Sequence, residues 1–278
     1  MKQNEIENIE VTLLLQAIYD RYGYDFRHYA RASVERRARY VMSLEKLNSI
    51  SEMIPLLLRD EPFFERLVHY FSITVTELFR DPFVYLALKE KVFPILQTYP
   101  FIKIWHAGGA TGEEVYSLAI LLKENGLYDR STIFCTDFND EALASGKQGI
   151  YNIDNIKGAT LNYQKAGGSG SLSEYYHAKY DSISMDKSLK RRITFANHNL
   201  VSDGIFGEMH LVLCRNVMIY FDTVLQNKVL NLFSDSLTNG GFLCLGTKES
   251  LQFSEVENKF VTFSEKEKIY RKKYIEEE

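Results

Sequence analysis

The sequence predicts a small all-helical N-terminal domain, followed by an α/β domain that carries a small inserted antiparallel β-subdomain. Residues 1–95 show only the apolar spacing of helices, and all five prolines lie at or before Pro100. From residue 101 onward, apolar runs of strand length alternate with helix-period segments. The alternation fails between Gly149 and Asn199, which indicates an insertion. We therefore expect the helical domain with its linker helix over 1–90, the α/β domain over 91–278 and the insertion over 155–196.

The individual elements follow from apolar spacing and from the positions of glycine and proline. In the N-terminal domain the expected helices are 11–22, 25–44, 52–60 and 62–71. In the α/β domain the expected strands are 101–107, 131–138, 209–217 and 242–247, and the expected helices are 113–126, 139–149 and 221–241. Residues 259–274 are expected to form a closing hairpin. Such alternation is typical of a parallel sheet with helices on both faces.

The inserted segment contains a flexible loop and a predicted β-hairpin. The loop "KAGGSGSLSE" spans 165–174, and residues 175–200 have the pattern strand, turn, strand, with the turn at "MDKS", 185–188. A hairpin inserted in this way is either a partner-binding arm or a plain surface insertion. The pattern alone leaves both open.

Composition is that of an ordinary globular protein. Hydrophobic residues make up 45% of the 278 positions and charged residues 25%, and the formal net charge is −4. This charge does not indicate a nucleic acid or an anionic membrane as partner. Cys135, Cys214 and Cys244 lie far apart in apolar runs without metal-ligand spacing, so we expect buried, reduced thiols. The N-terminus is polar and no apolar run approaches about 20 residues, so we expect a cytoplasmic protein.

A glycine-rich turn follows the first strand of the α/β domain. Gly108, Gly109 and Gly112 precede a helix, and Asp137 ends the next strand, where it can hydrogen-bond the hydroxyl pair of a ribose. Glycines let the backbone approach a ligand closely. The prediction is a nucleoside-containing ligand, and the alternative is a tight structural turn.

The helix after this turn opens with two carboxylates, Glu113 and Glu114. They would repel the pyrophosphate of a dinucleotide, whereas the ammonium and sulfonium groups of S-adenosylmethionine are attracted to carboxylates. The alternative is that acidic residues favour the first helical turn through the helix dipole. For the pair together we expect a cationic ligand.

Seven ordered segments carry a family resemblance over nearly the whole chain: "DFRHYARASVERRARYVM", "SITVTELFRDP", "WHAGGATGEEVYS", "TDFNDEALASGKQGIY", "ITFANHNL", "LCRNVMIYFD" and "GGFLCLGTKES". They resemble the motifs of the CheR-type chemotaxis-receptor (protein-glutamate O-) methyltransferases, and "CRNVMIYFD" is highly specific on its own. The resemblance implies an all-helical domain joined to a class I, Rossmann-like S-adenosylmethionine-dependent methyltransferase domain with a small inserted β-subdomain. The segmentation above has the same layout.

The resemblance implies how S-adenosylmethionine and its product S-adenosylhomocysteine would be bound. Glu113 would hold the methionine amine, and Asp137 would hold the ribose. The resemblance also implies that Asn199 and Leu200 border the adenine. Cys214 and Arg215 would line the cofactor cleft. Thr74, Thr76 and Arg80 would close this cleft from the linker side. No metal is implied.

The resemblance also implies the reaction, the transfer of a methyl group to a glutamate side chain of a receptor. That carboxylate is ionised at neutral pH, because its ordinary pKa is about 4.3, so no general base is needed. Arg80 and Tyr220 would lie nearest the methyl group, where Arg80 could orient the carboxylate and Tyr220 could donate a hydrogen bond or pack beside the methyl. The alternatives are an interdomain salt bridge for Arg80 and a core position for Tyr220.

The chain departs from the family pattern at a few positions: Thr74 for Asn, Leu78 for Phe, Val115 for Pro, Met209 and His210 for Phe-Asp, and Thr247 and Lys248 for His-Ser. Among these, only Thr74 is assigned to the cofactor.

Partner contacts are expected on two surfaces. A predicted helix over 21–46 is rich in basic residues: Arg21, Arg27, Arg31, Arg36, Arg37, Arg39 and Lys46, against Asp25, Glu35 and Glu45. The resemblance implies that this face meets the acidic helical bundle of a methyl-accepting receptor, or of another signalling protein. The alternative is a solvated, arginine-rich helix. The hairpin over 175–196 is the second candidate surface, and we expect a monomer without nucleic acid or membrane insertion.

Three other functions compete. One is a methyltransferase acting on a small molecule or a nucleic acid; amine- or base-directed enzymes often have a Pro-Pro-Tyr signature after the fourth strand, whereas this chain has Arg215-Asn216-Val217. A non-catalytic module that binds the cofactor or a partner is the alternative from another class. A dehydrogenase also stays possible, and titration with NADH tests it.

Overall fold

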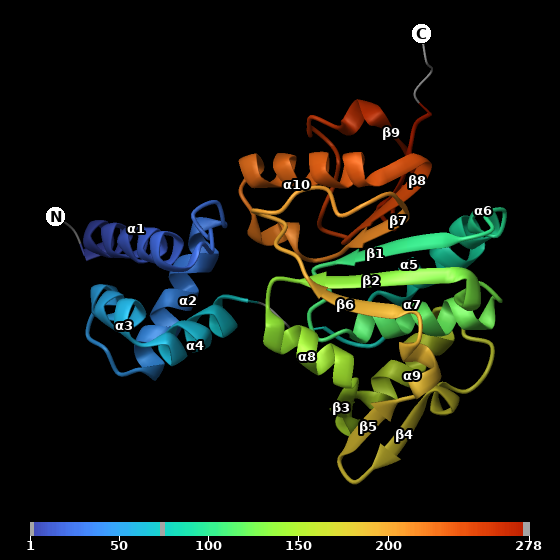
Figure 1. Ribbon diagram of the computed structural model, residues 1–278, viewed down its shortest axis with the longest axis horizontal. Helices are drawn as coiled ribbons and strands as arrows, with labels where there is room; N and C mark the ends of the chain where they lie inside the picture. The colour runs from blue at the N-terminus through green and yellow to red at the C-terminus, as the bar shows by residue number, and fades with distance from the viewer. Residues whose placement is uncertain (1–2, 73–75, 275–278) are drawn as a thin grey trace. The chain divides into compact units, whose positions relative to one another are not determined.

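The computed structural model describes residues 3–72 and 76–274 and divides them into two compact units (Figure 1). The helical unit consists of residues 3–72 and 219–228. The α/β unit consists of residues 76–218 and 229–274. Each unit is described by itself.

Four helices and one short 3₁₀ segment build the helical unit up to residue 72: α1 (Gln3–Tyr22), α2 (Arg31–Leu44), η1 (Ile50–Glu52), α3 (Met53–Arg59) and α4 (Glu61–Phe71). Gly23 ends α1 with a φ of +77°, and its N–H donates to the carbonyl of Tyr19. The core combines aliphatic and aromatic side chains, with Leu14, Ile18 and Leu67 fully buried and Phe63 and Phe71 almost so. The predicted all-helical character of this region is confirmed.

The helix expected over 25–44 starts too early, and the basic helix expected over 21–46 is interrupted, because α1 ends at Tyr22 and α2 begins only at Arg31. The segment between them pairs with residues 219–222 of the same unit. The N–H of Ala30 donates to the carbonyl of Tyr220 at 2.6 Å, and the N–H of Asp222 donates to the carbonyl of His28 at 2.8 Å. Backbone groups engaged in this way cannot also close a helical turn.

Residues 76–96 belong to the α/β unit, so among the described residues the units divide between residues 72 and 76, earlier than the expected residue 90. This stretch contains α5 (Pro82–Ala87), the π-helical η2 (Leu88–Val92) and α6 (Phe93–Leu96). Phe79, Val84 and Leu88 are completely buried in the same hydrophobic core as the main sheet. Their burial makes the segment part of that core.

A seven-stranded sheet in the order β6-β2-β1-β7-β8-β10-β9 forms the centre of the α/β unit (Figure 1). The strands are β1 (Ile102–Ala107), β2 (Ser131–Asp137), β6 (Ile193–Asn197), β7 (Met209–Cys214), β8 (Leu237–Leu245), β9 (Phe260–Ser264) and β10 (Ile269–Lys272). The first five in this order are parallel, whereas β10 is antiparallel to both β8 and β9. The predicted parallel α/β sheet with a closing hairpin is confirmed.

Both faces of this sheet are buried, as apolar strands of a parallel sheet require. Ile104 and Ile133 share a core with α7 (Glu113–Glu124), whereas the ring of Trp105 contacts Phe233 of α10 (Thr223–Ser236) at 5.4 Å. The remaining elements of this region are η3 (Tyr128–Arg130), α8 (Asp140–Gln148), η7 (Met218–Tyr220) and η8 (Glu257–Lys259).

The predicted helix over 221–241 is too long at its C-terminal end. The helix α10 ends at Ser236, and β8 begins at the next residue, Leu237. The pairing of β8 with β7 shifts register between Met209 and Leu211, and Gly240 has a φ of +75°. The glycines expected to end the helix therefore lie inside an irregular strand.

A three-stranded antiparallel sheet in the order β3-β5-β4 forms the inserted subdomain, which lies below the main sheet in Figure 1. Its elements are β3 (Ile150–Asn152), η4 (Ile153–Asn155), α9 (Ile156–Lys165), η5 (Leu172–Tyr175), β4 (Tyr176–Lys179), β5 (Ser182–Met185) and η6 (Lys187–Lys190). The predicted inserted antiparallel sheet is confirmed. It starts at residue 150, before the expected residue 155.

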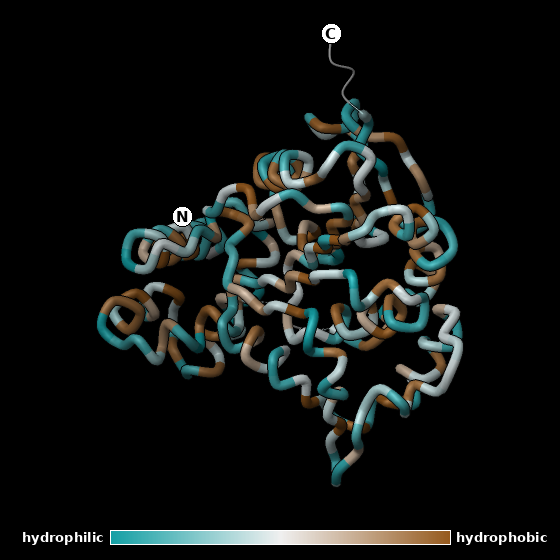
Figure 2. The backbone as a smooth tube through the Cα atoms, turned by 45° about the vertical axis from the view of Figure 1, so that its right-hand side comes forward, coloured by the Kyte–Doolittle hydropathy of each residue, from teal (hydrophilic) through white to brown (hydrophobic). Residues whose placement is uncertain are grey.

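The predicted strand pairing inside the insertion is partly wrong. The hairpin turns at Tyr180 and Asp181, between β4 and β5, and its tip is mostly hydrophilic at the bottom of Figure 2. The expected turn at 185–188 instead starts η6, because the Asp186 side chain accepts a hydrogen bond from the N–H of Ser188. The strand that follows, β6, pairs in parallel with β2 at the edge of the main sheet.

All three cysteines are buried and unbonded to one another, as expected. Over residues 3–72 and 76–274, no helix combines the length and the apolarity that crossing a bilayer requires.

Candidate functional site

The strand order places a candidate site at the carboxyl ends of β1, β2 and β7. The order of the parallel strands reverses beside β1, since β2 lies on one side of it and β7 on the other. Open α/β sheets bind ligands at such a reversal, outside the carboxyl ends of the strands. Here β1 leads into the glycine turn, β2 ends at Asp137 and β7 leads into Arg215.

The glycine turn has a backbone that its residue types make possible. Gly108 and Gly112 have φ values of +70° and +88°. A Cβ on Gly109 would lie 2.2 Å from the Sγ atom of Cys135 on β2, a distance that no side chain can occupy. Ala110, which lies between Gly109 and Gly112, also adopts a positive φ of +46°. The turn therefore packs directly on β2, and its backbone is open to a close ligand approach.

Asp137 is bound to this turn through its carboxylate. One oxygen accepts from the N–H of Ala110 at 2.9 Å, and the other accepts from the N–H of Asn139 at 3.0 Å. Burial raises the pKa of Asp137, and these backbone donors act against that rise. The backbone of Phe138 also hydrogen-bonds this carboxylate, which leaves about one of its four lone-pair sites to accept a hydroxyl of a ribose.

The segment predicted to border the adenine follows directly beside Asp137. The N–H of His198 donates to the carbonyl of Asp137 at 3.1 Å, so Asn199 and Leu200 leave β6 next to the end of β2. Leu200 is buried, and the Asn199 side chain accepts from the N–H of Val201 at 2.9 Å. Their contact with an adenine stays a prediction.

Glu113 lies on the other side of the turn, where it lines a cavity of about 250 Å³. Its carboxylate accepts a hydrogen bond from the Thr111 hydroxyl at 2.6 Å. Burial raises the pKa of Glu113 to about 7, and the Thr111 hydroxyl acts against the rise. A cationic ligand would stabilise the ionised form of this carboxyl group and so lower its raised pKa.

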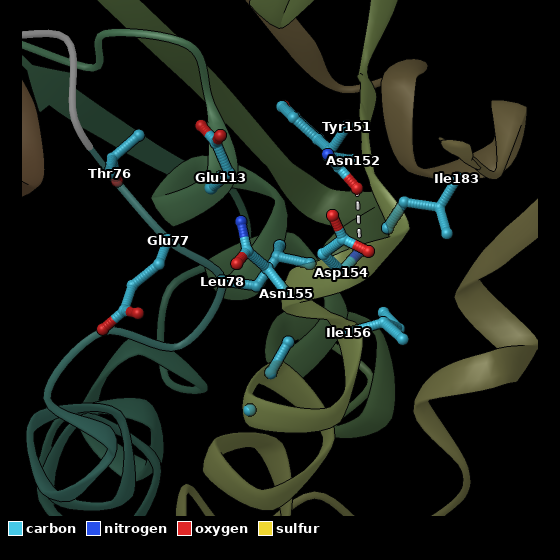
Figure 3. Close-up of a pocket in the computed structure, with 12 residues that line it drawn as sticks. Thr76, Glu77, Leu78, Glu113, Tyr151, Asn152, Asp154, Asn155, Ile156 and Ile183 are labelled. Carbon is cyan, nitrogen blue, oxygen red and sulfur yellow. Dashed lines mark hydrogen bonds between the residues drawn. The ribbon is translucent and has the colours of Figure 1, made fainter. Parts of the chain in front are cut away.

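Figure 3 shows this cavity between the segment before α5 and the start of the inserted subdomain. Thr76 and Glu77 line it from one side, and Tyr151, Asp154 and their neighbours line it from the other. The Oγ1 atom of Thr76 is buried and finds no hydrogen-bond partner among the described residues. An unsatisfied buried hydroxyl beside Glu113 is consistent with a polar ligand there.

Glu114 points away from this cavity, so the argument from paired carboxylates holds for Glu113 alone. Glu114 is buried and forms an ion pair with Arg215, and its other oxygen lies 3.5 Å from the Nε2 atom of His106. Burial acts to raise the pKa of Glu114, but Arg215 and His106, with a smaller effect of Arg80, together hold this pKa below its usual value.

Arg215 is buried completely, and its guanidinium group is bound within the protein. Its Nη2 atom lies 2.7 Å from the Asp81 carboxylate, and its Nη1 atom donates to the backbone carbonyl of Arg80 at 3.2 Å as well as to Glu114. The cofactor contact predicted for Arg215 stays a prediction. Cys214, which precedes it at the end of β7, also has no exposed surface.

Arg80 sits in a strained turn. The residues on both sides of it, Phe79 and Asp81, adopt left-handed φ values of +57° and +52°. Such conformations are unfavourable for residues other than glycine, and they occur preferentially at functional sites. The structure therefore gives the predicted catalytic arginine an unusual backbone.

Several residues of this region were missed as contributors from the sequence. Glu249, the residue retained in "GTKES", accepts hydrogen bonds from the N–H groups of Asn216 and Val217 and so fixes the turn after β7. The Tyr151 hydroxyl donates to the carbonyl of Thr111 at 2.7 Å and so ties the inserted subdomain to the glycine turn. Position within a motif was the only signal for both residues, since Glu249 lies in "GGFLCLGTKES" and Tyr151 ends "TDFNDEALASGKQGIY".

Tyr220 belongs to the helical unit, whereas Arg80 belongs to the α/β unit. Within its unit, the Tyr220 ring lies 5.1 Å from the guanidinium carbon of Arg37. Its catalytic role stays a prediction. Thr74, the remaining residue predicted to contact the cofactor, lies outside the described residues.

The expected basic face around 21–46 is less open than the sequence suggests. Arg37 is buried and donates to the carbonyl of Phe71, so it is not part of any surface. Other members pair with acids, as the partners Arg27–Asp25, Arg31–Glu35 and Arg39–Glu7 show. The inclusion of Arg37 is therefore wrong, and the rest of the face carries less uncompensated charge than a residue count indicates.

The sheet order also bears on the dehydrogenase alternative. In chain order the main strands read 3-2-1-4-5-7-6, with an antiparallel strand next to the edge, whereas the common dinucleotide-binding sheet is parallel in the order 3-2-1-4-5-6. The fold is thus a Rossmann-like variant that differs from that of the dinucleotide-binding enzymes.

Comparison with known proteins finds matching families and relatives over most of the chain. The family model "CheR methyltransferase, SAM binding domain" matches residues 74–269, and "CheR methyltransferase, all-alpha domain" matches residues 9–72. A Pseudomonas putida protein named "Putative methyltransferase Cher3" is 45% identical over 265 residues, which are 95% of this chain and 97% of that protein.

Two more distant relatives carry the name "Chemotaxis protein methyltransferase". The protein from Vibrio parahaemolyticus is 30% identical over 216 residues, with 74% of this chain and 76% of the relative covered. The protein from Borreliella burgdorferi is 26% identical over 263 residues, with 87% and 88% covered. Taken with the two family models, which span both units, these matches show that the chain belongs to the CheR family of methyltransferases.

Proposed function

We propose that this protein methylates glutamate side chains of a chemoreceptor or a related signalling protein, with S-adenosylmethionine as methyl donor. The observation that carries the proposal is the arrangement around the glycine turn, with the Asp137 carboxylate bound to the turn and Glu113 in the adjoining cavity. The family match and the names of the chemotaxis relatives support it.

The residues of the site fit this cofactor. Asp137 has a buried carboxylate that could accept a ribose hydroxyl, and Glu113 has a half-buried carboxylate for the methionine ammonium. The unsatisfied Thr76 hydroxyl could accept a further donor of the ligand. When bound, S-adenosylmethionine would supply a methyl group on a positively charged sulfur.

The protein would then orient a nucleophile that is already ionised. A glutamate with an ordinary pKa of about 4.3 carries its negative charge at neutral pH, so no residue needs to remove a proton. Arg80 would hold the carboxylate in line, and Tyr220 would donate a hydrogen bond to it or pack beside the methyl group. Alignment and exclusion of water then supply the rate enhancement.

For the partner, we propose the acidic helical bundle of a receptor. The support lies in the exposed arginines of the helical unit, such as Arg36, and in the projecting hairpin of β4 and β5. Complementary charge would increase the association rate and orient the encounter.

The first test concerns the cofactor. Calorimetric titration of the purified protein with S-adenosylhomocysteine should show micromolar or tighter binding, with NADH titrated in parallel as the control ligand. Binding of NADH alone would support the dehydrogenase alternative. A folded protein that binds neither would contradict the proposal and leave a role as an interaction module.

The second test concerns the reaction. Receptor cytoplasmic fragments should gain tritium from methyl-labelled S-adenosylmethionine, and mild alkali should release the label as methanol, because carboxyl methyl esters hydrolyse there and N-methyl groups do not. Label that survives alkali would point to a different acceptor group.

A further inference from the structure

We infer that Glu114 and Asp81 are positioning residues, which act through Arg215 to hold Arg80 in its strained turn. The inference rests on the proposed function, in which Arg80 orients the methyl-accepting carboxylate. Neither Glu114 nor Asp81 reaches the cavity that Glu113 lines.

The anchoring is visible in the contacts of one guanidinium group. Arg215 donates to the carbonyl of Arg80 at 3.2 Å and lies 2.7 Å from the carboxylate of Asp81. It reaches no solvent, because its side chain is 0% exposed. One buried group thus binds the strained turn at two consecutive residues, through the backbone carbonyl of Arg80 and the side-chain carboxylate of Asp81.

Glu114 supplies the charge that makes this arrangement possible. A buried guanidinium group is unfavourable without carboxylates to balance it. Asp81 is 30% exposed, whereas Glu114 is 7% exposed at its side chain and lies on the rigid first turn of α7. Glu114 is therefore the fixed counter-ion, and Asp81 is the one that belongs to the turn itself.

The same helix holds the turn at a second point. The Ser117 hydroxyl accepts from the N–H of Phe79 at 2.8 Å and donates to the carbonyl of Glu113 at 2.7 Å. Both flanks of Arg80 are thus tied to α7, the helix whose first residue faces the cofactor cavity. A left-handed residue persists only where its surroundings fix it, so loss of these ties should release the turn.

Glu114→Gln tests the inference, because it keeps the shape of the side chain and removes the charge. We expect kcat for methyl transfer to fall about tenfold, while the KM for S-adenosylmethionine and the affinity for S-adenosylhomocysteine change by less than about threefold. Asp81→Asn serves as a milder second variant, because asparagine tolerates the left-handed backbone. Glu90→Gln, an exposed acid on η2, is the matched control and should keep the wild-type kcat.

A double-mutant cycle separates positioning from general destabilisation. If Glu114 acts through Arg80, then Glu114→Gln should cause no further loss of kcat in an Arg80→Ala background. A loss that is the same in both backgrounds would overturn the inference.

Hydrogen exchange gives a readout that does not depend on activity. The peptide over residues 78–82 should exchange faster in Glu114→Gln and Asp81→Asn than in wild type and Glu90→Gln, and equal exchange in all four proteins would overturn the inference. A wild-type protein that transfers no methyl group would contradict the proposed function alone, and the exchange result would then decide whether the anchoring exists.

Discussion

Adjacent residues can have opposite roles, as Glu113 and Glu114 show at the start of α7. Successive side chains on a helix point about 100° apart, so one faces the cavity and the other faces the interior. Glu113 has a pKa raised to about 7, whereas Glu114 is held ionised by Arg215. Sequence reasoning could identify the pair, but it could not tell which carboxylate already had a partner.

The pKa of Glu113 predicts how ligand affinity depends on pH. Below pH 7 this carboxyl is mostly neutral and cannot balance the ammonium of S-adenosylhomocysteine. Binding therefore requires loss of a proton there, and affinity should rise about tenfold from pH 6 to pH 8 and then level off. Calorimetry at both pH values measures this change.

Glu113→Gln is the control for that pH dependence. The variant should bind more weakly and show a nearly flat profile over the same range. A wild-type affinity that is equal at pH 6 and pH 8 would mean that Glu113 does not hold the ligand ammonium.

We expect the affinity for S-adenosylhomocysteine to depend on hydrogen bonds to Asp137. Asp137→Ala should weaken binding of S-adenosylhomocysteine about tenfold or more, because the ribose acceptors are lost and the N–H of Ala110 is left without its partner. Asp129→Ala, an exposed acid on η3, should bind like wild type. Unchanged affinity in Asp137→Ala, measured by the same calorimetry, would remove the ribose assignment.

At the scale of elements, the glycine turn depends on its contact with β2. Gly109→Ala should lower the free energy of unfolding by about 2 kcal/mol or more, because the new Cβ overlaps the Sγ atom of Cys135. Gly158→Ala, in α9, meets no atom within 4 Å and should be neutral or stabilising by up to about 1 kcal/mol. Chemical denaturation measures both, and equal stability of the two variants would contradict the packing of this turn.

The helical unit contains a similar contrast between two neighbouring arginines of α2. Arg37→Ala should destabilise the protein by about 2 kcal/mol, because it leaves the carbonyl of Phe71 without its donor and the ring of Tyr220 without its cationic neighbour. Arg36→Ala, one residue away on the exposed side, should change stability by less than about 0.5 kcal/mol. Denaturation curves that coincide for the two variants would show that Arg37 is not buried.

Elements whose partners are near in sequence, or whose pattern is strong, could be predicted. The strand of β1, the glycine turn and α7 follow from apolar spacing and from glycine. The end of the first helix near Gly23 could also be predicted, but the late start of α2 at Arg31 could not, because it depends on pairing of Tyr29 with Phe221, which lies far away in the sequence. The same holds for β6, whose residues look like half of a hairpin but pair with β2.

At the scale of the whole molecule, the order of layers and the site at the strand ends were predictable, and the internal network was not. Motifs identified Glu113, Asp137 and Arg80 as candidates. The contacts of Arg215 with Glu114, Asp81 and the carbonyl of Arg80 depend on three segments that meet only in the folded chain. The amino-acid composition and the spacing of residues along the chain carry no information about contacts between segments that come together only on folding.

The most direct test of the central claim is to locate the transferred methyl group by mass spectrometry. A receptor cytoplasmic fragment is incubated with the protein and S-adenosylmethionine, and its peptides are sequenced before and after mild alkali. The account predicts a single methyl addition on glutamate side chains that alkali removes, and its loss with Arg80→Ala or Asp137→Ala. Methyl groups on lysine, arginine or a backbone amine, or none on any receptor fragment from a protein that binds S-adenosylhomocysteine, would contradict it.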